Sequence, residues 1–173
     1  MGNSMSDNRE QAARLTAQEC SGIDQILSHY PVASGAAIDL LKMIQHEHGW
    51  VSDQHLRALA EYTHIPIAEL ESVATFYNLI FRKPVGNNVL HPCNGVSCLL
   101  MGYRQVHQTL TQTLGIVDGE TTQDNAFTLI PLPCLGACDK APVVLINDQL
   151  HEKVRPDQID TIIHAVSRKA QPQ

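Results

Sequence analysis

Four of the five cysteines in this chain of 173 residues form two close pairs. Cys93 and Cys98 enclose four residues, and Cys134 and Cys138 enclose three. Each pair follows a short apolar run that reads as a strand, so the two loops can meet at one edge of a sheet and present four thiolates. Four thiolates around two irons are the usual ligand set of a 2Fe-2S cluster. The pattern therefore predicts that Cys93, Cys98, Cys134 and Cys138 bind one 2Fe-2S cluster.

The residues between these cysteines suit an anionic cofactor. A 2Fe-2S core with four thiolates is negatively charged in both oxidation states, so donors that bring no further negative charge stabilise it. Gly95 and Gly136 lack a Cβ and let backbone amides approach the sulfurs, while Ser97 can add a hydroxyl. Cys98 lies at the expected start of a helix, where the helix dipole favours an anionic ligand.

Three other interpretations of the paired cysteines can be compared with this one. A structural zinc site usually takes a C-x2-C pair but tolerates up to four intervening residues, so zinc stays open as an alternative. A thioredoxin-type dithiol requires C-x-x-C, which the chain lacks. A Rieske centre requires histidine ligands, but no histidine closely follows Cys134, and His91 reads as a strand residue.

The remaining residues that could bind a metal are assigned no such role. Cys20 stands alone in a helical stretch and is expected to be a small buried or half-buried side chain. His46, Glu47 and His48 resemble the start of a zinc protease motif, but the second histidine follows too soon after the glutamate for the two imidazoles to share a helix face.

Composition narrows the class of protein. The formal charge of −6 and the pI of about 5.8 argue against nucleic acid or an anionic membrane surface as the main partner, because both require a basic face. No run approaches the roughly 18 apolar residues of a membrane span, and residues 1–18 contain no apolar signal core. Five cysteines without such a signal indicate metal or redox chemistry rather than disulfides. We therefore expect a cytoplasmic protein that docks on other proteins and does not insert into the membrane.

The first half of the chain reads as helices. A capping box at Thr16 opens a helix that Pro31 stops, and a second apolar stripe ends at Gly49, a natural left-handed C-terminal cap. Ser52 restarts a helix and Pro66 opens another. These signals predict a helical bundle.

After the turn residues 84–88 the pattern changes to short apolar runs rich in branched residues. The expected elements, in order, are a strand over 89–92, a helix over 99–114 closed by Gly115, strands over 127–132, 143–146 and 150–154, and a helix that begins at Pro156. This order suits a small sheet covered by helices, hence an α+β protein.

Several motifs in their order along the chain carry a family resemblance. They are His48-Gly49-Trp50-Val51-Ser52, Val73-Ala74-Thr75-Phe76-Tyr77, Lys83-Pro84-Val85-Gly86, the two cysteine pairs, and Ala141-Pro142-Val143. With these the sequence, from about Tyr30 to Val166, resembles the small iron-sulfur subunits, the E subunits, of NADH:quinone oxidoreductase, complex I of the respiratory chain.

The resemblance implies a fold and a division of the chain. Residues 1–28 would be a flexible leader and the start of the first helix, 29–85 a helical bundle, and 86–173 a thioredoxin-like α/β ferredoxin domain. The four cysteines would bind the 2Fe-2S cluster, which in this family accepts an electron from FMN on a side branch of the route to quinone.

The resemblance also implies partners. The chain would dock on the subunit that binds FMN and NADH, beside other peripheral-arm subunits, at the inner face of the cell membrane. It would not oxidise NADH alone, because it contains no G-x-G-x-x-G and no other phosphate-binding glycine loop. Two alternatives stay open: the equivalent diaphorase subunit of an NAD-dependent hydrogenase or formate dehydrogenase, and a zinc-stabilised interaction module.

Overall fold

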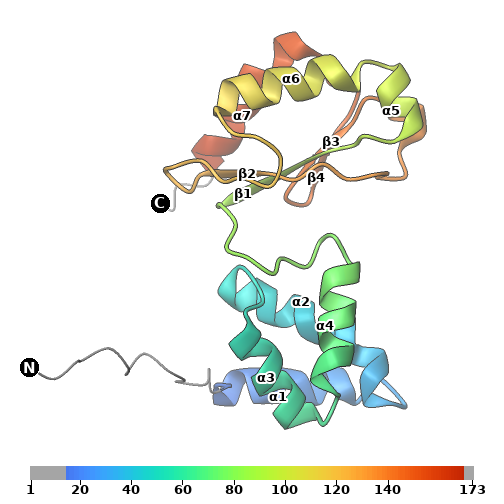
Figure 1. Cartoon of the computed structure of the whole chain (residues 1–173), viewed down its shortest axis with the longest axis vertical. Coiled ribbons are helices and arrows are strands. Elements are labelled where there is room, and N and C mark those ends of the chain that lie inside the picture. The colour runs from blue at the N-terminus through green and yellow to red at the C-terminus, as the bar shows by residue number, and fades with distance from the viewer. Residues whose placement is uncertain (1–14, 170–173) are drawn as a thin grey trace, which may run out of the picture. The chain divides into compact units, whose positions relative to one another are not determined.

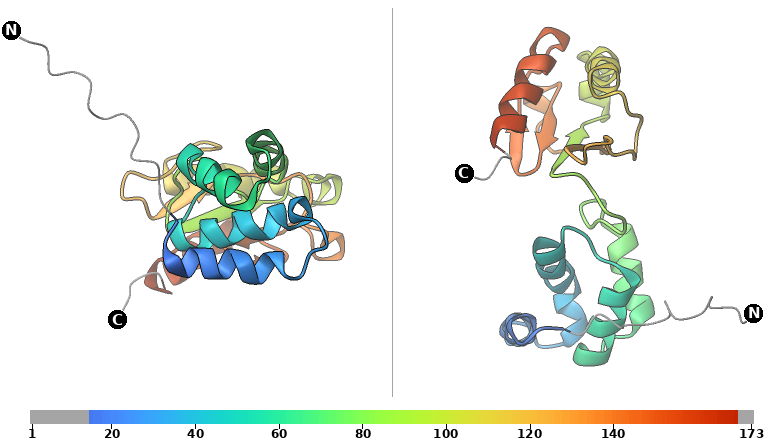
Figure 2. Two further views of the ribbon diagram at one scale, coloured as in Figure 1. Left: turned by 90° about the horizontal axis from the view of Figure 1, so that it is seen from below. Right: turned by 90° about the vertical axis from the view of Figure 1, so that its left-hand side faces the viewer.

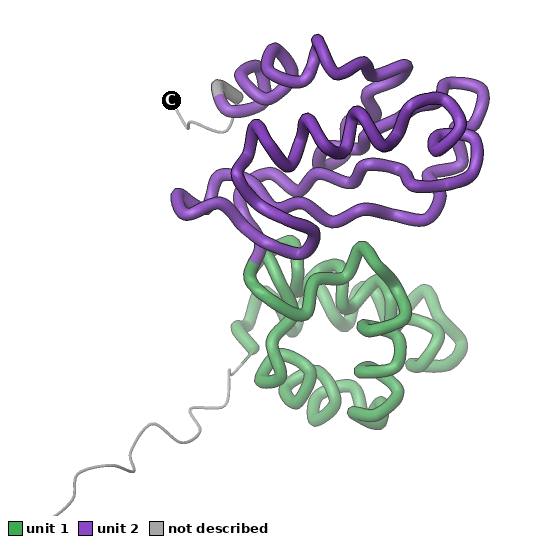
Figure 3. The backbone as a smooth tube through the Cα atoms, turned by 45° about the horizontal axis from the view of Figure 1, so that its top comes forward, with its two compact units in different colours: residues 1–84 green, residues 85–173 purple. Residues whose placement is uncertain are grey.

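The computed structural model describes residues 15–169, and its chain divides into two compact units, residues 1–84 and 85–173 (Figure 3). The first 14 residues of the expected leader lie outside the described residues. Within the described range, no helix combines the length and the apolar character that a bilayer crossing requires.

The first unit is helical (Figure 1). Its elements are α1 (Ala17–Leu27), the 3-10 turn η1 (Ala33–Ala36), α2 (Ala37–His48), α3 (Asp53–Thr63) and α4 (Ile67–Phe76). The expected helix signals are confirmed: Thr16 and Ser52 form capping boxes with Glu19 and His55, and Gly49 caps α2 with a φ of 79°.

Apolar side chains at helical spacing form the core of this unit. Burial of each large aliphatic side chain contributes about 1.5–3 kcal/mol, which is the main force that holds helices of this length together. The largest fully buried members are Ile23, Leu40, Leu41, Ile44, Leu56, Leu59 and Leu70.

A buried carboxylate joins three of these helices. Glu19 is 7% exposed, and its Oε2 accepts hydrogen bonds from the Thr16 amide at 2.6 Å and the Thr16 hydroxyl at 2.8 Å. Its Oε1 lies 2.6 Å from Nε2 of His48 on α2, and the His48 ring stacks on the ring of His55 on α3 with centroids 4.3 Å apart. A buried charge is tolerated only when paired and hydrogen-bonded in this way. His48 is thus a structural residue.

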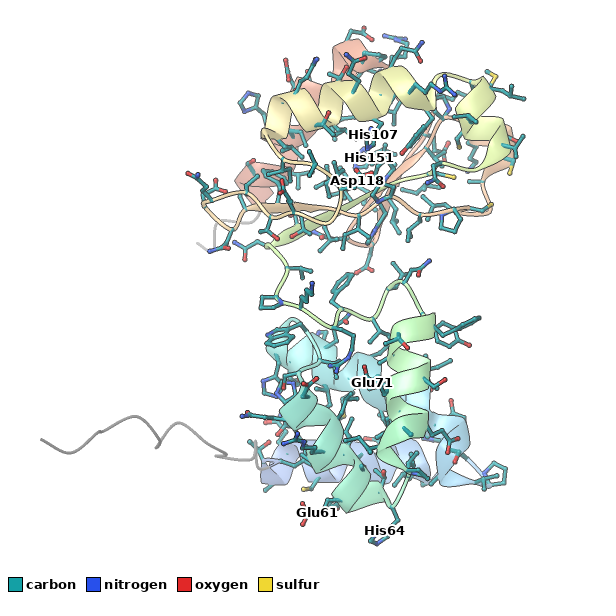
Figure 4. All side chains as sticks on the ribbon, viewed as in Figure 1. Glu61, His64, Glu71, His107, Asp118 and His151 are labelled. Carbon is teal, nitrogen blue, oxygen red and sulfur yellow. The ribbon has the colours of Figure 1, made fainter. Side chains whose placement is uncertain are left out.

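The segment after α4 is tied back to the bundle by side chains. The guanidinium of Arg82 donates to the Val51 carbonyl and lies 2.5 Å from Asp53 and 2.9 Å from Glu71, which is labelled in Figure 4. The amide of Gln45 donates to the Leu79 carbonyl at 2.8 Å and accepts from the Phe81 amide at 2.6 Å. These contacts fix the chain that leads out of the first unit.

The second unit is a four-stranded mixed sheet with helices. Its elements are β1 (Asn88–Pro92), α5 (Val96–Leu100), α6 (Tyr103–Leu114), β2 (Phe127–Leu129), η2 (Cys138–Lys140), β3 (Val144–Ile146), β4 (Gln149–His151), η3 (Pro156–Gln158) and α7 (Ile159–Lys169). The strand order is β2-β1-β3-β4, and α6 and α7 lie side by side on one face of the sheet (Figures 1 and 2). The predicted order of strands and helices is confirmed.

The connections explain the strand directions. The crossover through α5 and α6 makes β1 and β2 parallel, whereas the short turn at Asn147 and Asp148 makes β3 and β4 antiparallel. Asn147 has a φ of 51°, a conformation that asparagine tolerates in tight hairpin turns. Leu90 on the central strand pairs with Leu129 on one side and Ile146 on the other, and all three belong to the core shared with α6 and α7.

Three expected boundaries were wrong in detail. The single helix expected over 99–114 is two helices, because Gly102 turns the chain with a φ of 111°. The strand expected over 127–132 ends at Leu129, although the amides of Ile130 and Leu132 still donate to the carbonyls of Leu90 and Pro92 at 2.8 and 3.1 Å. The last strand ends at His151, and Pro156 begins a 3-10 turn that precedes α7.

We predict that Glu19→Gln destabilises the helical unit by about 1 kcal/mol at neutral pH, because a neutral amide accepts weaker hydrogen bonds than a carboxylate. Burial acts to raise the pKa of Glu19, but the hydrogen bonds from Thr16 and His48 leave it below the usual 4.5. A lowered carboxyl pKa stabilises the fold above 4.5, and this stabilisation is lost as the pH falls through the folded value.

The difference in unfolding free energy between wild type and Glu19→Gln should therefore close between about pH 5 and pH 3. Urea unfolding followed by the fluorescence of Trp50, the single tryptophan, measures it in this unit. Glu47→Gln, at a half-exposed carboxylate on α2, is the control and should change little. A difference in unfolding free energy that stays constant with pH would contradict a lowered pKa of Glu19 in the folded protein.

Candidate metal centre

The two cysteine loops meet at one cavity in the second unit. Cys93, Cys98, Cys134 and Cys138 all line this cavity, whose volume is about 470 Å³. The rest of the lining consists of Asn94, Gly95, Val96, Ser97 and Pro133. The structure therefore brings together the four cysteines that the sequence singled out.

Backbone hydrogen bonds from the sheet hold the first loop. The Cys93 amide donates to the Val143 carbonyl at 3.1 Å, and the Asn94 amide donates to the Leu132 carbonyl at 2.9 Å. Cys93 also forms a parallel bridge with Leu132 just beyond the end of β2. Because β1 and β2 run parallel, the loops that follow them leave the sheet at the same edge.

The loop that carries Cys138 is fixed on its other side by the segment after β4. The Lys153 amide donates to the Lys140 carbonyl at 2.8 Å, and the Val154 amide donates to the Pro142 carbonyl at 2.9 Å. The peptide bond between Ala141 and Pro142 is cis. The two hydrogen bonds hold the short turn η2, in which Cys138 is the first residue, beside the segment that follows β4.

The four thiols differ in exposure. Cys93 and Cys98 are 3% and 2% exposed, and they pack with Ala141, Val143 and the half-buried Tyr103. Cys134 and Cys138 are exposed. The cavity is therefore lined by buried residues beside Cys93 and Cys98 and is open to solvent beside Cys134 and Cys138.

The glycines of the two loops act in different ways. Gly136 has a φ of 73°, and its amide donates to the sulfur of Cys134 at 3.4 Å, as expected of a loop that supplies amides to a sulfur. Gly95 separates the loops: a Cβ at this position would lie 2.8 Å from the Pro133 carbonyl oxygen and 3.5 Å from the Cys93 sulfur. The close approach of the two loops therefore requires glycine at position 95.

Burial raises the pKa of the Cys98 thiol, a hydrogen bond with the backbone of Val143 opposes the rise, and the neighbouring Cys93 and Cys138 add to it. The neutral thiol is therefore favoured when no metal is bound, so a metal or cluster must displace its proton. Cys98 is the third residue of α5 rather than the first residue of a helix. Cys98 therefore lies in the first turn of a helix, as expected, although a helix of five residues stabilises an anionic sulfur only weakly.

The donor set fits a two-iron cofactor. Within residues 15–169, no three or more His, Cys, Asp or Glu side chains are grouped so as to hold one metal ion. A 2Fe-2S core needs four thiolates over two irons, and the four thiols that line one cavity match that number. Cys20 is half-buried on α1 in the other unit, beside Tyr62, and does not belong to this set.

Sequence reasoning did not identify the apolar residues that wall the site. Tyr103, Ala141 and Val143 surround the two buried cysteines, and Pro133 faces Gly95. In the sequence, the position of Ala141-Pro142-Val143 soon after Cys138 is the one signal that could have indicated part of this wall.

Comparison with known proteins places this site in a family. Residues 23–167 match the model of the thioredoxin-like [2Fe-2S] ferredoxins. The chain belongs to this family. Its cofactor is accordingly a 2Fe-2S cluster, and the expected α+β fold with a thioredoxin-like domain is confirmed.

Curated relatives cover nearly the whole chain. The E subunit of NADH-quinone oxidoreductase from Buchnera aphidicola (subspecies Acyrthosiphon pisum) is 41% identical over 152 residues, which cover 88% of this chain and 94% of the relative. The protein of the same name from Escherichia coli K12 is 39% identical over 153 residues, which cover 88% and 92%.

The corresponding protein of Pseudomonas aeruginosa, which has the same name, is 41% identical over 151 residues, which cover 87% of this chain and 91% of the relative. Among solved structures, an NAD+-reducing [NiFe]-hydrogenase in the air-oxidized state aligns with a TM-score of 0.64 and 23% identity. That alignment covers 75% of this chain and 23% of the hydrogenase chain, and it shows a shared fold.

We predict that Gly95→Ala lowers cluster occupancy, because the new methyl group forces the Cys93 loop away from Pro133. Iron and acid-labile sulfide per chain are the measurement. Gly119→Ala is the matched control, since its Cβ would meet nothing within 4 Å although its φ of 83° adds backbone strain. Equal iron content in the two variants would show that the spacing of the loops is not critical.

Proposed function

We propose that Cys93, Cys98, Cys134 and Cys138 hold the 2Fe-2S cluster and that the chain is an electron-transfer subunit of the NADH dehydrogenase module of NADH:quinone oxidoreductase. The convergence of the four cysteines on one cavity is the observation that carries the ligand assignment. The assignment to this complex is supported by relatives of about 40% identity that carry the name of its E subunit.

When bound, the cluster supplies one-electron chemistry. The residues of this chain then have separate tasks. Cys93 and Cys98 hold the dry side of the centre, where Tyr103 and Val143 keep water from the sulfurs. The Gly136 amide donates to the Cys134 sulfur and offsets part of the negative charge, which favours the reduced state.

The partner in this proposal is the subunit that binds FMN and NADH. A hydride carries two electrons, so a flavin must stand between NADH and a one-electron centre. This chain contains no glycine-rich nucleotide loop in its sequence, and its loops with Gly95 and Gly136 serve the cysteines. As a subunit of this complex, the chain would lie in the cytoplasm, and the other subunits would hold it at the inner face of the membrane.

The parent complex is tested by co-purification from the native cell. Recovery of quinone-reductase subunits with this chain supports the proposal, whereas recovery of hydrogenase or formate dehydrogenase subunits would assign it to a different NAD-dependent complex.

The zinc alternative is tested by the colour of the purified protein. A red-brown protein that bleaches on reduction contains iron and sulfide, whereas a colourless protein with stoichiometric zinc would refute electron transfer.

The ligand assignment predicts that Cys93→Ala, Cys98→Ala, Cys134→Ala and Cys138→Ala each lose most of the cluster, because each removes one of four thiolates. Cys20→Ala should retain iron and sulfide at the wild-type level. Metal and sulfide analysis with visible absorption measures all five variants. A full cluster in any of the first four would exclude that cysteine as a required ligand.

If the flavin is bound by a partner subunit, NADH alone should leave the cluster of this chain oxidised. Under anaerobic conditions, flavin-free protein is mixed with excess NADH while the visible band and the electron spin signal are followed. Reduction is expected only after the FMN-binding subunit is added, with dithionite as the positive control. Prompt reduction by NADH without any flavoprotein would contradict the proposed role.

A further inference from the structure

The short helix beside the cysteine cavity exposes an apolar surface. Four neighbouring side chains of α5 and the residue after it are solvent-exposed: Val96 by 76%, Leu99 by 41%, Leu100 by 80% and Met101 by 63%. We refer to these four residues as the α5 stripe. Val96 also lines the cavity, so the stripe begins at the edge of the candidate cluster site.

Helix geometry places three of these four residues on one face of α5, and Met101 follows as the cap residue. Residues three and four apart share a face of an α-helix, so Val96, Leu99 and Leu100 lie together. Cys98 is buried on the opposite side, 2% exposed, where its thiol lines the cavity. The helix therefore directs its ligand inward and its apolar residues to solvent, the reverse of an ordinary surface helix.

Contiguous exposed apolar residues of this kind mark interaction surfaces more often than single ones do. Within the described part of the second unit, Val117 is the other large exposed hydrophobic, 61% exposed. It follows α6 in the chain, whereas α5 precedes that helix. The apolar exposure of this unit is thus concentrated at the cysteine cavity.

We propose that the α5 stripe is a docking surface for the flavin-bearing partner subunit, an inference that rests on the proposed function. Electron transfer weakens steeply with distance, so the donor must sit at the accessible side of the cavity, where Cys134 and Cys138 are exposed. A partner seated there covers the adjoining stripe. We therefore expect the partner to present an apolar contact surface next to its flavin.

A second copy of the chain is a poorer occupant. Four side chains provide a few hundred Å² of apolar surface, below the roughly 800 Å² per partner that a stable complex of two proteins buries. A subunit of a larger complex can be held by other contacts as well.

The test compares variants of the full chain with cluster bound. Leu100→Glu and Met101→Glu place a charge on the stripe at residues that do not line the cavity, and Leu100→Met keeps the surface apolar. Val117→Glu is the matched control at a similarly exposed apolar side chain. The dissociation constant with the purified FMN-binding subunit from the same cell is measured, together with the rate of NADH-driven cluster reduction.

Leu100→Glu and Met101→Glu should keep their cluster and its reduction by dithionite but bind the FMN-binding subunit at least about tenfold more weakly. Leu100→Met and Val117→Glu should bind like wild type. If wild type binds and both stripe variants bind equally well, the docking inference is wrong while the proposed function stands. If wild type itself neither binds the FMN-binding subunit nor is reduced through it, the proposed function fails first. A wild-type dimer that Leu100→Glu converts to a monomer would assign the stripe to self-association and overturn the proposal.

Discussion

The second unit depends on the close approach of two loops that carry cysteines. Four thiols can face one cavity only if the backbone after β1 and the backbone after β2 come within contact distance, and Gly95 against the Pro133 carbonyl is where they do. The parallel pairing of β1 and β2 brings both loops to one edge, and the Cys93–Leu132 bridge extends that pairing into the site. A side chain at position 95 would oppose this arrangement directly.

The same constraint shapes the surroundings of the site. Because Cys98 must turn inward from α5, the outward face of that helix carries Val96, Leu99 and Leu100. Beyond the end of β2, the amides of Ile130 and Leu132 still donate to β1, so the chain stays beside that strand until the Cys134 loop begins. Beneath α6 and α7, the core packs apolar residues of three strands against the two helices.

The helical unit is organised by polar contacts as well as by its core. Glu19, His48 and His55 connect three helices through one buried carboxylate, and Arg82 connects the exit segment to residues on α3 and α4. The attraction within these pairs adds little net stability, because desolvation offsets it at the buried Glu19 and solvent screens it at the exposed Asp53. On the second unit, the pair between His107 on α6 and Asp118, labelled in Figure 4 and 2.7 Å apart, links the helix to its following loop.

The sequence by itself indicated a four-cysteine centre, with a 2Fe-2S cluster favoured and zinc left open, and it determined most of the elements. Capping boxes at Thr16 and Ser52, the left-handed cap at Gly49 and the alternation of apolar runs are local signals, so they can be interpreted correctly without a fold. Paired cysteines likewise indicate their chemistry by spacing. Only the tertiary structure decided what depends on contacts between distant segments: the burial of Cys93 and Cys98 against the exposure of Cys134 and Cys138, the need for glycine at position 95, and the break at Gly102 that isolates α5. Periodicity predicted one helix there because Leu99 and Tyr103 fit one apolar face, but the left-handed Gly102 ends that face, so that Leu99 is exposed while Tyr103 packs with the buried cysteines.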